Sequence, residues 1–430
     1  MYSGKKGLRC RVCTGCGLCP GVTPEGSAAG KIHVLAEEAI ENRYLSAENT
    51  GKSSGNGGDG SSDSRNCGRR LAVADVGTTT IAMLLYDAAG TVTERYAAVN
   101  PQTVFGADVI SRIHAAEDTG KAEELRRLVT GVLEQGLTRF QKHLSGGESM
   151  QLVLAANTTM TYLLMGWDTS ELGCAPFRAS RISVAETVIS GVPCFVFPGQ
   201  SAFVGGDITA GMLACGMAER EEMTLLVDLG TNGELALGNR DRRIACATAA
   251  GPAFEGGVNR GIWGADMVHF LAVLRREGLL DETGLLEEPY FERGIRIGNV
   301  TVTQEAVRSV QLAKAAIAAG IEILLEKYGL HANQVERVVL AGGFGYYLNP
   351  EDAAEIGLLP EELAKRAVAG GNTALLGAKL AGAELVGCED GQIAVMRRLE
   401  KLKEGTECVN LAEEADFGER YMRRMKLKKE

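Results

Sequence analysis

The sequence predicts an α/β fold built from two duplicated domains with a cleft between them. Two near-identical peptides, Ala74–Thr80 and Val227–Glu234, each follow an apolar run of β type. A third apolar run, 338–341, leads into the glycine-rich turn 342–345. Each of these segments is therefore predicted to be a buried strand that ends in a tight turn, and the near-identity of the first two indicates duplication.

The predicted elements follow a similar order in both halves. Domain I, 69–221, is expected to contain strand, strand, helix, helix and strand at 70–76, 80–87, about 107–117, about 121–145 and 151–156. Domain II, 222–390, is expected to contain three strands and two long helices at 224–229, 233–238, 242–247, 264–278 and 303–328. The last helix is predicted to begin after an N-cap at Thr303 and to end at Gly329.

Shorter segments flank the two domains. Residues 1–48 are predicted to form a Cys-rich module and 49–68 a flexible linker, because 51–64 contains no apolar side chain. A linker of about 20 residues has an end-to-end distance on the order of 25 Å, so the module is expected to move relative to the domains. Residues 391–430 are predicted to form a C-terminal strand–helix extension.

Composition excludes several classes of protein. The net charge of −10 and the pI near 5.3 argue against nucleic acid as a partner. No apolar run approaches the ~20 residues of a membrane span, and the first residues form no apolar signal segment, so no membrane contact and a cytoplasmic location are expected. Four scattered cysteines with apolar neighbours are predicted to be inert core thiols: Cys174, Cys194, Cys215 and Cys246.

The two Asp-x-Gly-Thr turns carry groups that suit a phosphate and a divalent cation. Gly lets backbone N–H groups approach a phosphate, and hydroxyls donate to its oxygens. A carboxylate would repel a phosphate alone but can hold a hydrated Mg²⁺, so Asp75 and Asp228 are predicted as magnesium ligands. The alternative is that each carboxylate caps its own glycine turn. The predicted phosphate-binding residues are Gly77, Thr78, Thr79, Thr80, Gly230, Thr231 and Asn232.

The third turn is rich in glycine, so the flat base and the ribose of a nucleotide could lie directly against its backbone. The residues predicted to form this contact are Gly342, Gly343, Phe344 and Gly345. Three elements thus follow one another along the chain: a strand with Asp-x-Gly-Thr, a second strand with Asp-x-Gly-Thr, and a strand with Gly-Gly-x-Gly. This order resembles the actin, sugar-kinase and heat-shock-chaperone ATPase superfamily. The resemblance implies two ribonuclease-H-like domains that bind ATP and Mg²⁺ in a central cleft.

The sequence from about residue 70 to the C-terminus resembles one branch of that superfamily more closely. The peptides that carry this resemblance are Asn100–Gln102, Phe105–Ile113, Ala156–Met160, Gly173–Phe177, Ala249–Gly256 and Gln311–Ile317. They look like the ATPase part of the reductive activators of corrinoid-dependent enzymes. Two features depart from that family: its N-terminal plant-type ferredoxin domain is not visible, and a segment that normally follows Gly257 is missing.

The resemblance implies ATP-driven, one-electron reduction of an inactive Co(II) corrinoid to Co(I), as expected of an anaerobe. The implied partner is a corrinoid protein or corrinoid-dependent methyltransferase, with electrons arriving through an iron–sulfur cluster or from an external ferredoxin, and a homodimer is a further expected state. Two alternatives stay open. The chain could be a small-molecule kinase of the same fold, or an ATP-binding regulator without activation activity.

Four further residues are candidates for the nucleotide site. Asp207 lies in a Gly-Gly-Asp peptide at the expected start of a helix, where it is either a base that orients the attacking water or an N-cap. The peptide resembles the Gly-Asp helix start that supplies the base in sugar kinases of the superfamily. Glu234, Glu255 and Lys314 are predicted to bind the nucleotide or its metal-linked water, with structural roles as the alternative.

A second predicted site lies near the N-terminus. Cys10, Cys13, Cys16 and Cys19 occupy one short loop. Four thiolates at this spacing suit a 4Fe–4S cluster, and the peptide resembles bacterial ferredoxins. Zinc is one alternative, because a tetrahedral set of four cysteines suits it as well, and a loop that holds neither is the other. A 48-residue module also lacks the core to fold unaided, so a metal is expected to hold it together.

Overall fold

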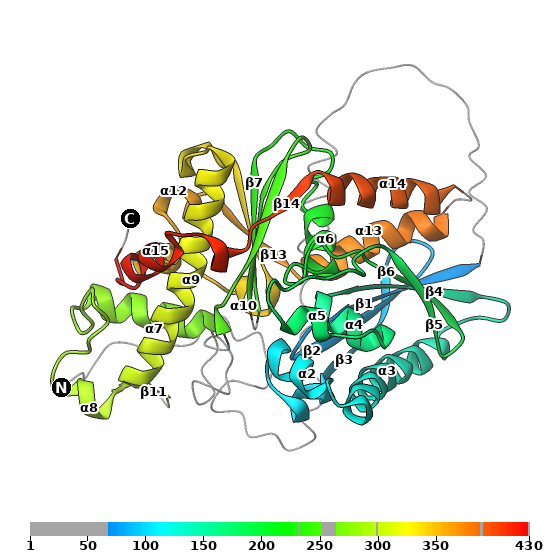
Figure 1. Cartoon of the computed structure of the whole chain (residues 1–430), viewed down its shortest axis with the longest axis horizontal. Helices are drawn as coiled ribbons and strands as arrows, with labels where there is room; N and C mark the ends of the chain where they lie inside the picture. The colour runs from blue at the N-terminus through cyan, green and yellow to red at the C-terminus, as the bar shows by residue number, and fades with distance from the viewer. Residues whose placement is uncertain (1–67, 231, 252–263, 298–299, 388–389, 429–430) are drawn as a thin grey trace. The chain divides into compact units, whose positions relative to one another are not determined.

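A computed structural model of the chain describes residues 68–230, 232–251, 264–297, 300–387 and 390–428 (Figure 1). The chain divides into two units, which we name after the strand-end aspartate that each contains. The Asp75 unit comprises the described residues within 68–214 and 370–404, and the Asp228 unit those within 215–369 and 405–428. Among these residues no helix combines the length and the apolar character that a bilayer crossing needs.

A mixed six-stranded sheet forms the centre of the Asp75 unit, in the order β3-β2-β1-β4-β6-β5. Strand β1 pairs antiparallel with β2 and parallel with β4, and β4 continues parallel to β6. The strands are β1 (Arg69–Val76), β2 (Thr80–Tyr86), β3 (Val92–Val99), β4 (Ser149–Ala156), β5 (Ala185–Ile189) and β6 (Val192–Val196).

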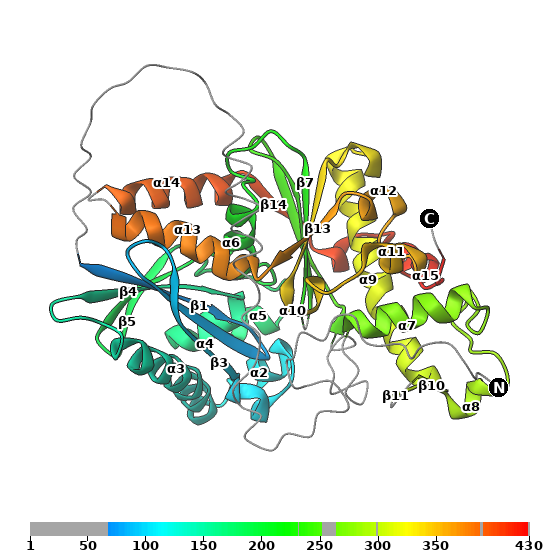
Figure 2. The ribbon, with the colours of Figure 1, turned by 180° about the vertical axis from the view of Figure 1, so that it is seen from behind.

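Helices cover both faces of this sheet, because side chains alternate across each strand. Ala72 and Ala74 of β1 face the core that contains the apolar side of α3, whereas Leu71 contacts Gly382 of α13. Helix α13 also packs on α6 and lies beside α14 in both views (Figures 1 and 2). The helices are η1 (Pro101–Phe105), α2 (Val109–Ala115), α3 (Thr119–Gln141), α4 (Thr158–Met165), α5 (Ser170–Gly173), α6 (Gly206–Ala214), α13 (Thr373–Gly387) and α14 (Gly391–Glu404).

The sheet of the Asp228 unit repeats this plan, in the order β13-β12-β7-β8-β9-β14. Strand β7 pairs antiparallel with β8 and parallel with β12, as β1 does with β2 and β4. The strands are β7 (Thr224–Leu229), β8 (Gly233–Gly238), β9 (Arg243–Thr248), β12 (Arg337–Ala341), β13 (Ala367–Gly371) and β14 (Thr406–Cys408), with β10 (Ile295–Ile297) and β11 (Val300–Val302) in a separate ribbon.

A long helix, α9 (Gln304–Tyr328), packs on β8 and β9, and α15 (Phe417–Arg424) packs on α9. Buried side chains of β7, α7 and α9 share one apolar core, for example Val227, Leu271 and Ile317. The remaining helices are α7 (Gly264–Arg276), α8 (Tyr290–Arg293), η3 (Ala332–Gln334), α10 (Gly342–Gly345), α11 (Pro350–Glu355), α12 (Glu361–Ala364) and η4 (Leu411–Glu413).

The predicted α/β fold with duplicated domains is confirmed, and most predicted elements lie within a few residues of their observed bounds. The Thr303 side chain accepts the Ala306 N–H and Gly329 is left-handed, as the predicted ends of α9 require. The two units divide the chain differently from the predicted boundaries at 222–390 and 391–430, because α13 and α14 pack in the Asp75 unit. The prediction of a core thiol was wrong for Cys174, which is exposed where α5 ends in a loop.

Candidate functional site

The Asp75 carboxylate lies at the end of β1 and is held by an amide from a distant part of the chain. Its Oδ2 accepts a hydrogen bond of 2.6 Å from Nδ2 of Asn372, the residue before α13. Asn372 is itself fixed, because its Oδ1 accepts the Leu375 N–H. Burial raises the pKa of Asp75 to about 6, against the opposing effect of the Asn372 bond. Sequence reasoning missed Asn372, although its position after the strand-end glycines Gly370 and Gly371 was a signal of the same kind as the turn at 342–345.

The structure brings Asp207 to the same place. Burial and, as a smaller contribution, the negative charge of nearby Asp75 together raise its pKa to about 7. The carboxylate accepts the N–H of the adjacent Ile208 at 2.8 Å. Close backbone contact explains its position, because a Cβ on Gly205 would lie 2.4 Å from the Asn157 Cα. A carboxyl group whose pKa is raised by burial and by a second carboxylate nearby is a common feature of sites that bind metals or orient water.

The turn that follows β1 is fixed by hydrogen bonds, including bonds from side chains of other segments. The Gly77 N–H donates to the Thr80 carbonyl at 2.9 Å, which closes the turn. Asn100 Nδ2 donates to the Gly77 carbonyl at 2.9 Å, and the Asn157 amide donates to the Thr78 hydroxyl at 3.1 Å. Thr78 is almost fully buried. The turn is therefore rigid, and its predicted residues Gly77, Thr78, Thr79 and Thr80 lie next to Asp75.

The Asp228 unit contains the second carboxylate in an equivalent position. Asp228 lies opposite Glu234 of β8 and Ala341 of β12, so the predicted residues Asp228 and Glu234 are brought together. The Gly230 N–H donates to the Asn232 carbonyl at 2.9 Å, a closed turn like that at Gly77. Thr231 and Glu255 lie outside the described residues.

The glycine turn after β12 lies directly against Asp228. Gly342 has a φ of +84°, and a Cβ there would lie 2.5 Å from Oδ1 of Asp228. Gly343 is exposed, and a Cβ there would meet no heavy atom of the described residues within 4 Å. The Phe344 ring packs in the apolar core and Gly345 is buried, so Gly343 is the exposed residue of this segment. The predicted contact of the segment with a base stays a prediction.

Lys314, predicted at the nucleotide, is buried in α9 and donates to the Lys426 carbonyl near the end of the chain. Burial lowers its pKa to about 7. Gln311, one turn earlier, donates to the carbonyls of Thr283 and Met425, each at 2.9 Å. The structure therefore places Lys314 under the C-terminal segment, and its predicted contact with a nucleotide stays a prediction.

The cysteines of the predicted metal site, Cys10, Cys13, Cys16 and Cys19, lie outside the described residues. Within the part of the chain that the structure describes, no group of three or more His, Cys, Asp or Glu side chains could hold a metal ion. The Asp75 and Asp207 carboxylates are a pair, which suits Mg²⁺ because this ion keeps several waters and takes further oxygens from a bound phosphate.

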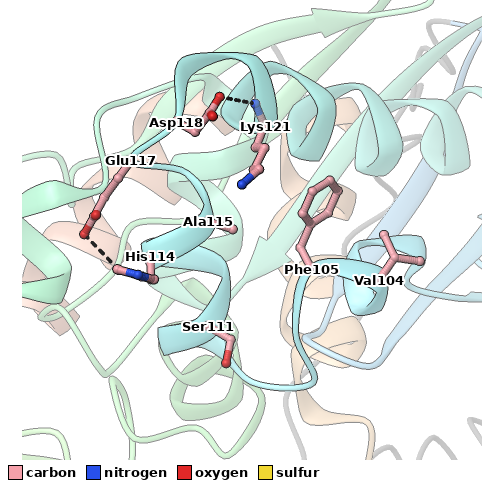
Figure 3. A pocket seen from close by; sticks show the side chains of 8 residues that line it. All are labelled: Val104, Phe105, Ser111, His114, Ala115, Glu117, Asp118 and Lys121. Carbon is pink, nitrogen blue, oxygen red and sulfur yellow. Dashed lines mark hydrogen bonds and ion pairs between the residues drawn. The ribbon is translucent and has the colours of Figure 1, made fainter.

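The Asp75 unit also contains an open hollow, lined by residues of η1, α2 and the start of α3 (Figure 3). Helix α2 contributes Ser111, His114 and Ala115 to it, and Phe105 lies across from them. His114 Nδ1 lies 3.2 Å from Oε1 of Glu117 at its rim. None of the predicted site residues lines this hollow.

Two family models match consecutive parts of the chain. The model of the RACo middle region matches 71–220, and the model of the C-terminal domain of RACo, the ASKHA domain, matches 222–262 and 258–430. The corrinoid activation enzyme RamQ of Eubacterium limosum is 32% identical over 377 residues, which cover 71% of this chain and 63% of RamQ. A Co(II) methylated amine-specific corrinoid protein reductase of Methanosarcina barkeri is 24% identical over 63% of this chain and 62% of its own length. The chain thus spans less than two thirds of the length of these relatives.

A solved structure has the same fold. The reductive activator for corrinoid, iron-sulfur protein superimposes with a TM-score of 0.73 and 28% identity, over 86% of this chain and 67% of that chain. The matched regions contain both strand-end aspartates and the glycine turn after β12. The chain therefore belongs to the RACo family, with the RACo middle region at 71–220 and the C-terminal ASKHA domain from 222 to 430.

Proposed function

We propose that this chain is an ATP-dependent reductive activator, which drives the reduction of an inactive Co(II) corrinoid on a partner protein to Co(I). The observation that carries the proposal is the repeated strand-end site. Asp75 and Asp228 occupy equivalent positions on β1 and β7, each followed by a closed glycine turn. Relatives that match 71% and 63% of this chain are named for corrinoid activation and Co(II) corrinoid protein reduction.

In this proposal the strand-end site of each unit supplies groups that suit Mg-ATP. The turns at 77–80 and 230–232 donate backbone and hydroxyl hydrogens to phosphate oxygens, and Gly343 supports the base. When bound, Mg²⁺ neutralises phosphate charge and favours the ionised form of nearby carboxyls. Asp75 and Asp228 are the carboxylates that would hold metal-bound waters, Asn372 orients Asp75, and Asp207 would orient the water that attacks the γ-phosphate.

ATP binding would favour a conformation in which the activator and its corrinoid partner exchange an electron, because a ligand shifts an equilibrium toward the state that it binds better. Cys10, Cys13, Cys16 and Cys19 are proposed to hold an iron–sulfur cluster, with zinc as the alternative. Anaerobic purification followed by iron, sulfide and zinc analysis and electron paramagnetic resonance distinguishes these two.

The decisive experiment adds Mg-ATP to the anaerobic full-length protein with a reductant and a Co(II) corrinoid protein. Loss of the Co(II) resonance signal that requires ATP supports the proposal, and its persistence under all conditions contradicts it. A kinase of the same fold is the second candidate, because an Asp207 carboxyl with a pKa of about 7 also suits a general base. ATP turnover that depends on a sugar or acyl substrate, rather than on a corrinoid protein, would favour the kinase.

A further inference from the structure

A fully buried arginine lies behind the first phosphate turn. Arg112 of α2 has no exposed surface. Its Nη2 donates to the Thr78 carbonyl at 2.6 Å, and its Nε donates to the Gly106 carbonyl at 3.1 Å. Its Nη1 lies 3.2 Å from the Gln102 side-chain oxygen and 3.4 Å from the Met160 sulfur. One guanidinium thus connects the turn at 77–80, the corner at 101–106 and helix α4.

The bond to Thr78 fixes the direction of one peptide group. In a trans peptide the C=O and the N–H of the next residue point in opposite directions. Since the Thr78 carbonyl points at Arg112, the Thr79 N–H points away from it. In the same way, the Asn100 amide that holds the Gly77 carbonyl directs the Thr78 N–H outward. Two successive N–H groups aimed to one side form a concave backbone surface that binds anions.

Packing alone does not account for a charged group at this position. Burial of a guanidinium is costly unless hydrogen bonds compensate for the lost water, and an apolar side chain of similar volume often serves a core as well. The side chains around Arg112 are themselves polar and buried: Gln102 and Asn100 have no exposed surface, and Gln102 Nε2 donates to the Leu125 carbonyl at 2.8 Å. A polar network of this kind holds a backbone in one conformation, which is what a preorganised anion site requires.

We propose that Arg112 is a positioning residue for phosphate binding: it holds the Thr78–Thr79 peptide so that the Thr79 N–H faces a nucleotide phosphate. The inference rests on the proposed function, since it assumes that the turn at 77–80 receives that phosphate. Arg112 itself does not touch the nucleotide. Helix α2 also presents Ser111, His114 and Ala115 to the open hollow, so the same helix joins an outer surface to the phosphate turn (Figure 3).

The test compares full-length Arg112→Met and Arg112→Lys with the wild type by calorimetric titration of Mg-ATP, Mg-ADP and adenosine. Arg112→Met removes every donor, so Mg-ATP and Mg-ADP affinities should fall about tenfold or more while adenosine affinity stays unchanged. Arg112→Lys keeps one charged donor and should recover part of the loss. Equal losses for the nucleotides and adenosine would overturn the inference, because they would mean a general disturbance of the fold.

Arg243 supplies a matched control in the other unit. It is also almost fully buried, and its Nη1 donates to the backbone carbonyls of Met217, Asn239 and Arg240, away from any phosphate turn. Arg243→Met should lower thermal stability as much as Arg112→Met but keep the ratio of Mg-ATP to adenosine affinity. If the two variants change that ratio alike, Arg112 has only a structural role.

A measurement on the wild type keeps the inference testable if Arg112→Met does not fold. The backbone amide resonance of Thr79 in ¹⁵N-labelled protein should shift on addition of Mg-ATP or Mg-ADP and stay in place with adenosine. A Thr79 resonance that stays in place while Mg-ATP binds would overturn the inference and leave the proposed function intact. A wild type that binds no Mg-ATP would overturn both.

Discussion

Asp75 differs from the many aspartates that only cap a turn. Asp87, which follows β2, is such a residue: its Oδ1 accepts the N–H groups of Ala89 and Thr91 at 2.9 and 2.8 Å. The Asp75 carboxylate instead accepts a side-chain amide from the start of α13, and its pKa is raised because it is buried. A carboxylate that is desolvated and held at a strand end fits a metal-linked role better than a local cap.

Asp75→Ala and Asp228→Ala are each expected to reduce Mg-ATP hydrolysis by roughly 10²-fold or more, because each removes a charge that organises the metal and phosphates. Circular dichroism should show an unchanged fold. Asp87→Ala is the matched control and should keep wild-type hydrolysis. Wild-type turnover in either of the first two variants would show that the strand-end carboxylates do not organise the phosphate.

Asp207→Asn keeps the shape of the side chain but removes its capacity to take a proton. If Asp207 orients the attacking water, kcat should fall by roughly 10²–10⁴-fold with little change in the affinity for Mg-ATP. Steady-state hydrolysis and nucleotide titration on the same preparation separate the two effects. An unchanged kcat would instead mean that Asp207 serves only its bond to the Ile208 N–H.

At the scale of elements, the turn after β12 contains two glycines with opposite surroundings. A Cβ on Gly342 would lie 2.4 Å from the Leu229 carbonyl and 2.5 Å from Oδ1 of Asp228. Gly342→Ala should therefore displace Asp228, lower the melting temperature and weaken Mg-ATP binding. Gly343→Ala is its control for stability, because its Cβ would meet no described atom within 4 Å, and the melting temperature should not change.

Gly343→Ala also tests where the base lies. A methyl group on exposed backbone would obstruct a flat base that rests there, so Mg-ATP and adenosine affinities should fall together. Unchanged affinity for both ligands in a stable Gly343→Ala protein would place the base elsewhere.

Lys314 of helix α9 is buried beneath the C-terminal segment. Because burial lowers its pKa, the free energy of unfolding is expected to depend on pH. The pKa of Lys314 is about 7 in the fold and near 10.5 when exposed. Below pH 7 Lys314 is charged in both the folded and the unfolded state, so the folded state bears the whole free-energy cost of burying the charge. Between pH 7 and 10.5 the unfolded state binds more protons, so the stability of the wild type should rise with pH through this window.

Lys314→Met removes the buried charge and should remove this rise. From pH 6.5 to 9.5 the wild type should therefore gain on the order of 1–3 kcal/mol of unfolding free energy relative to the variant. Denaturant titrations at both values measure it. Lys365→Met, at an exposed lysine that pairs with Glu361, should keep the wild-type dependence. A difference that does not change with pH would mean that Lys314 stays charged in the fold.

Elements with strong local signals were predictable, and those fixed by distant contacts were not. The ends of α9 follow from Thr303 and Gly329, which act through their own hydrogen bonds and backbone conformation. Strand β3 was not predicted, because Glu94 and Arg95 interrupt its apolar pattern at the edge of the sheet. The place of α13 in the Asp75 unit depends on Gly377, whose missing side chain admits the Ala210 backbone, and no local pattern reveals that contact.

The same distinction applies to the candidate site. Asp75, Asp207 and the turn at 77–80 were predicted from strand ends and glycines, and the structure brings them together in one unit. Asn372 and Arg112 were missed as site residues because each acts across a long stretch of sequence, on Asp75 and on Thr78. Side chains that position a site through tertiary contacts carry no spacing that a single sequence can show.

At the scale of the whole molecule, the proposed activity needs an electron source as well as an ATP site. Both units have their own apolar core and their own strand-end site, and the segment 51–64 has no apolar side chain that could join a core. The proposed electron carrier, at Cys10, Cys13, Cys16 and Cys19, lies before that segment. Nucleotide binding and electron delivery are therefore expected to be separable.

Deletion of residues 1–66 should leave Mg-ATP affinity unchanged, because every residue proposed to bind the nucleotide lies after Arg69. The deletion should abolish ATP-dependent reduction of a cob(II)alamin-bearing partner when no other donor is present, and an added ferredoxin should restore it if an external donor can substitute. The measurement follows the Co(II) signal anaerobically with the intact and the shortened protein, with and without ATP. Equal reduction by both forms without ferredoxin would make the Cys-rich module a structural metal site, whereas reduction by neither form would favour the kinase or the regulator.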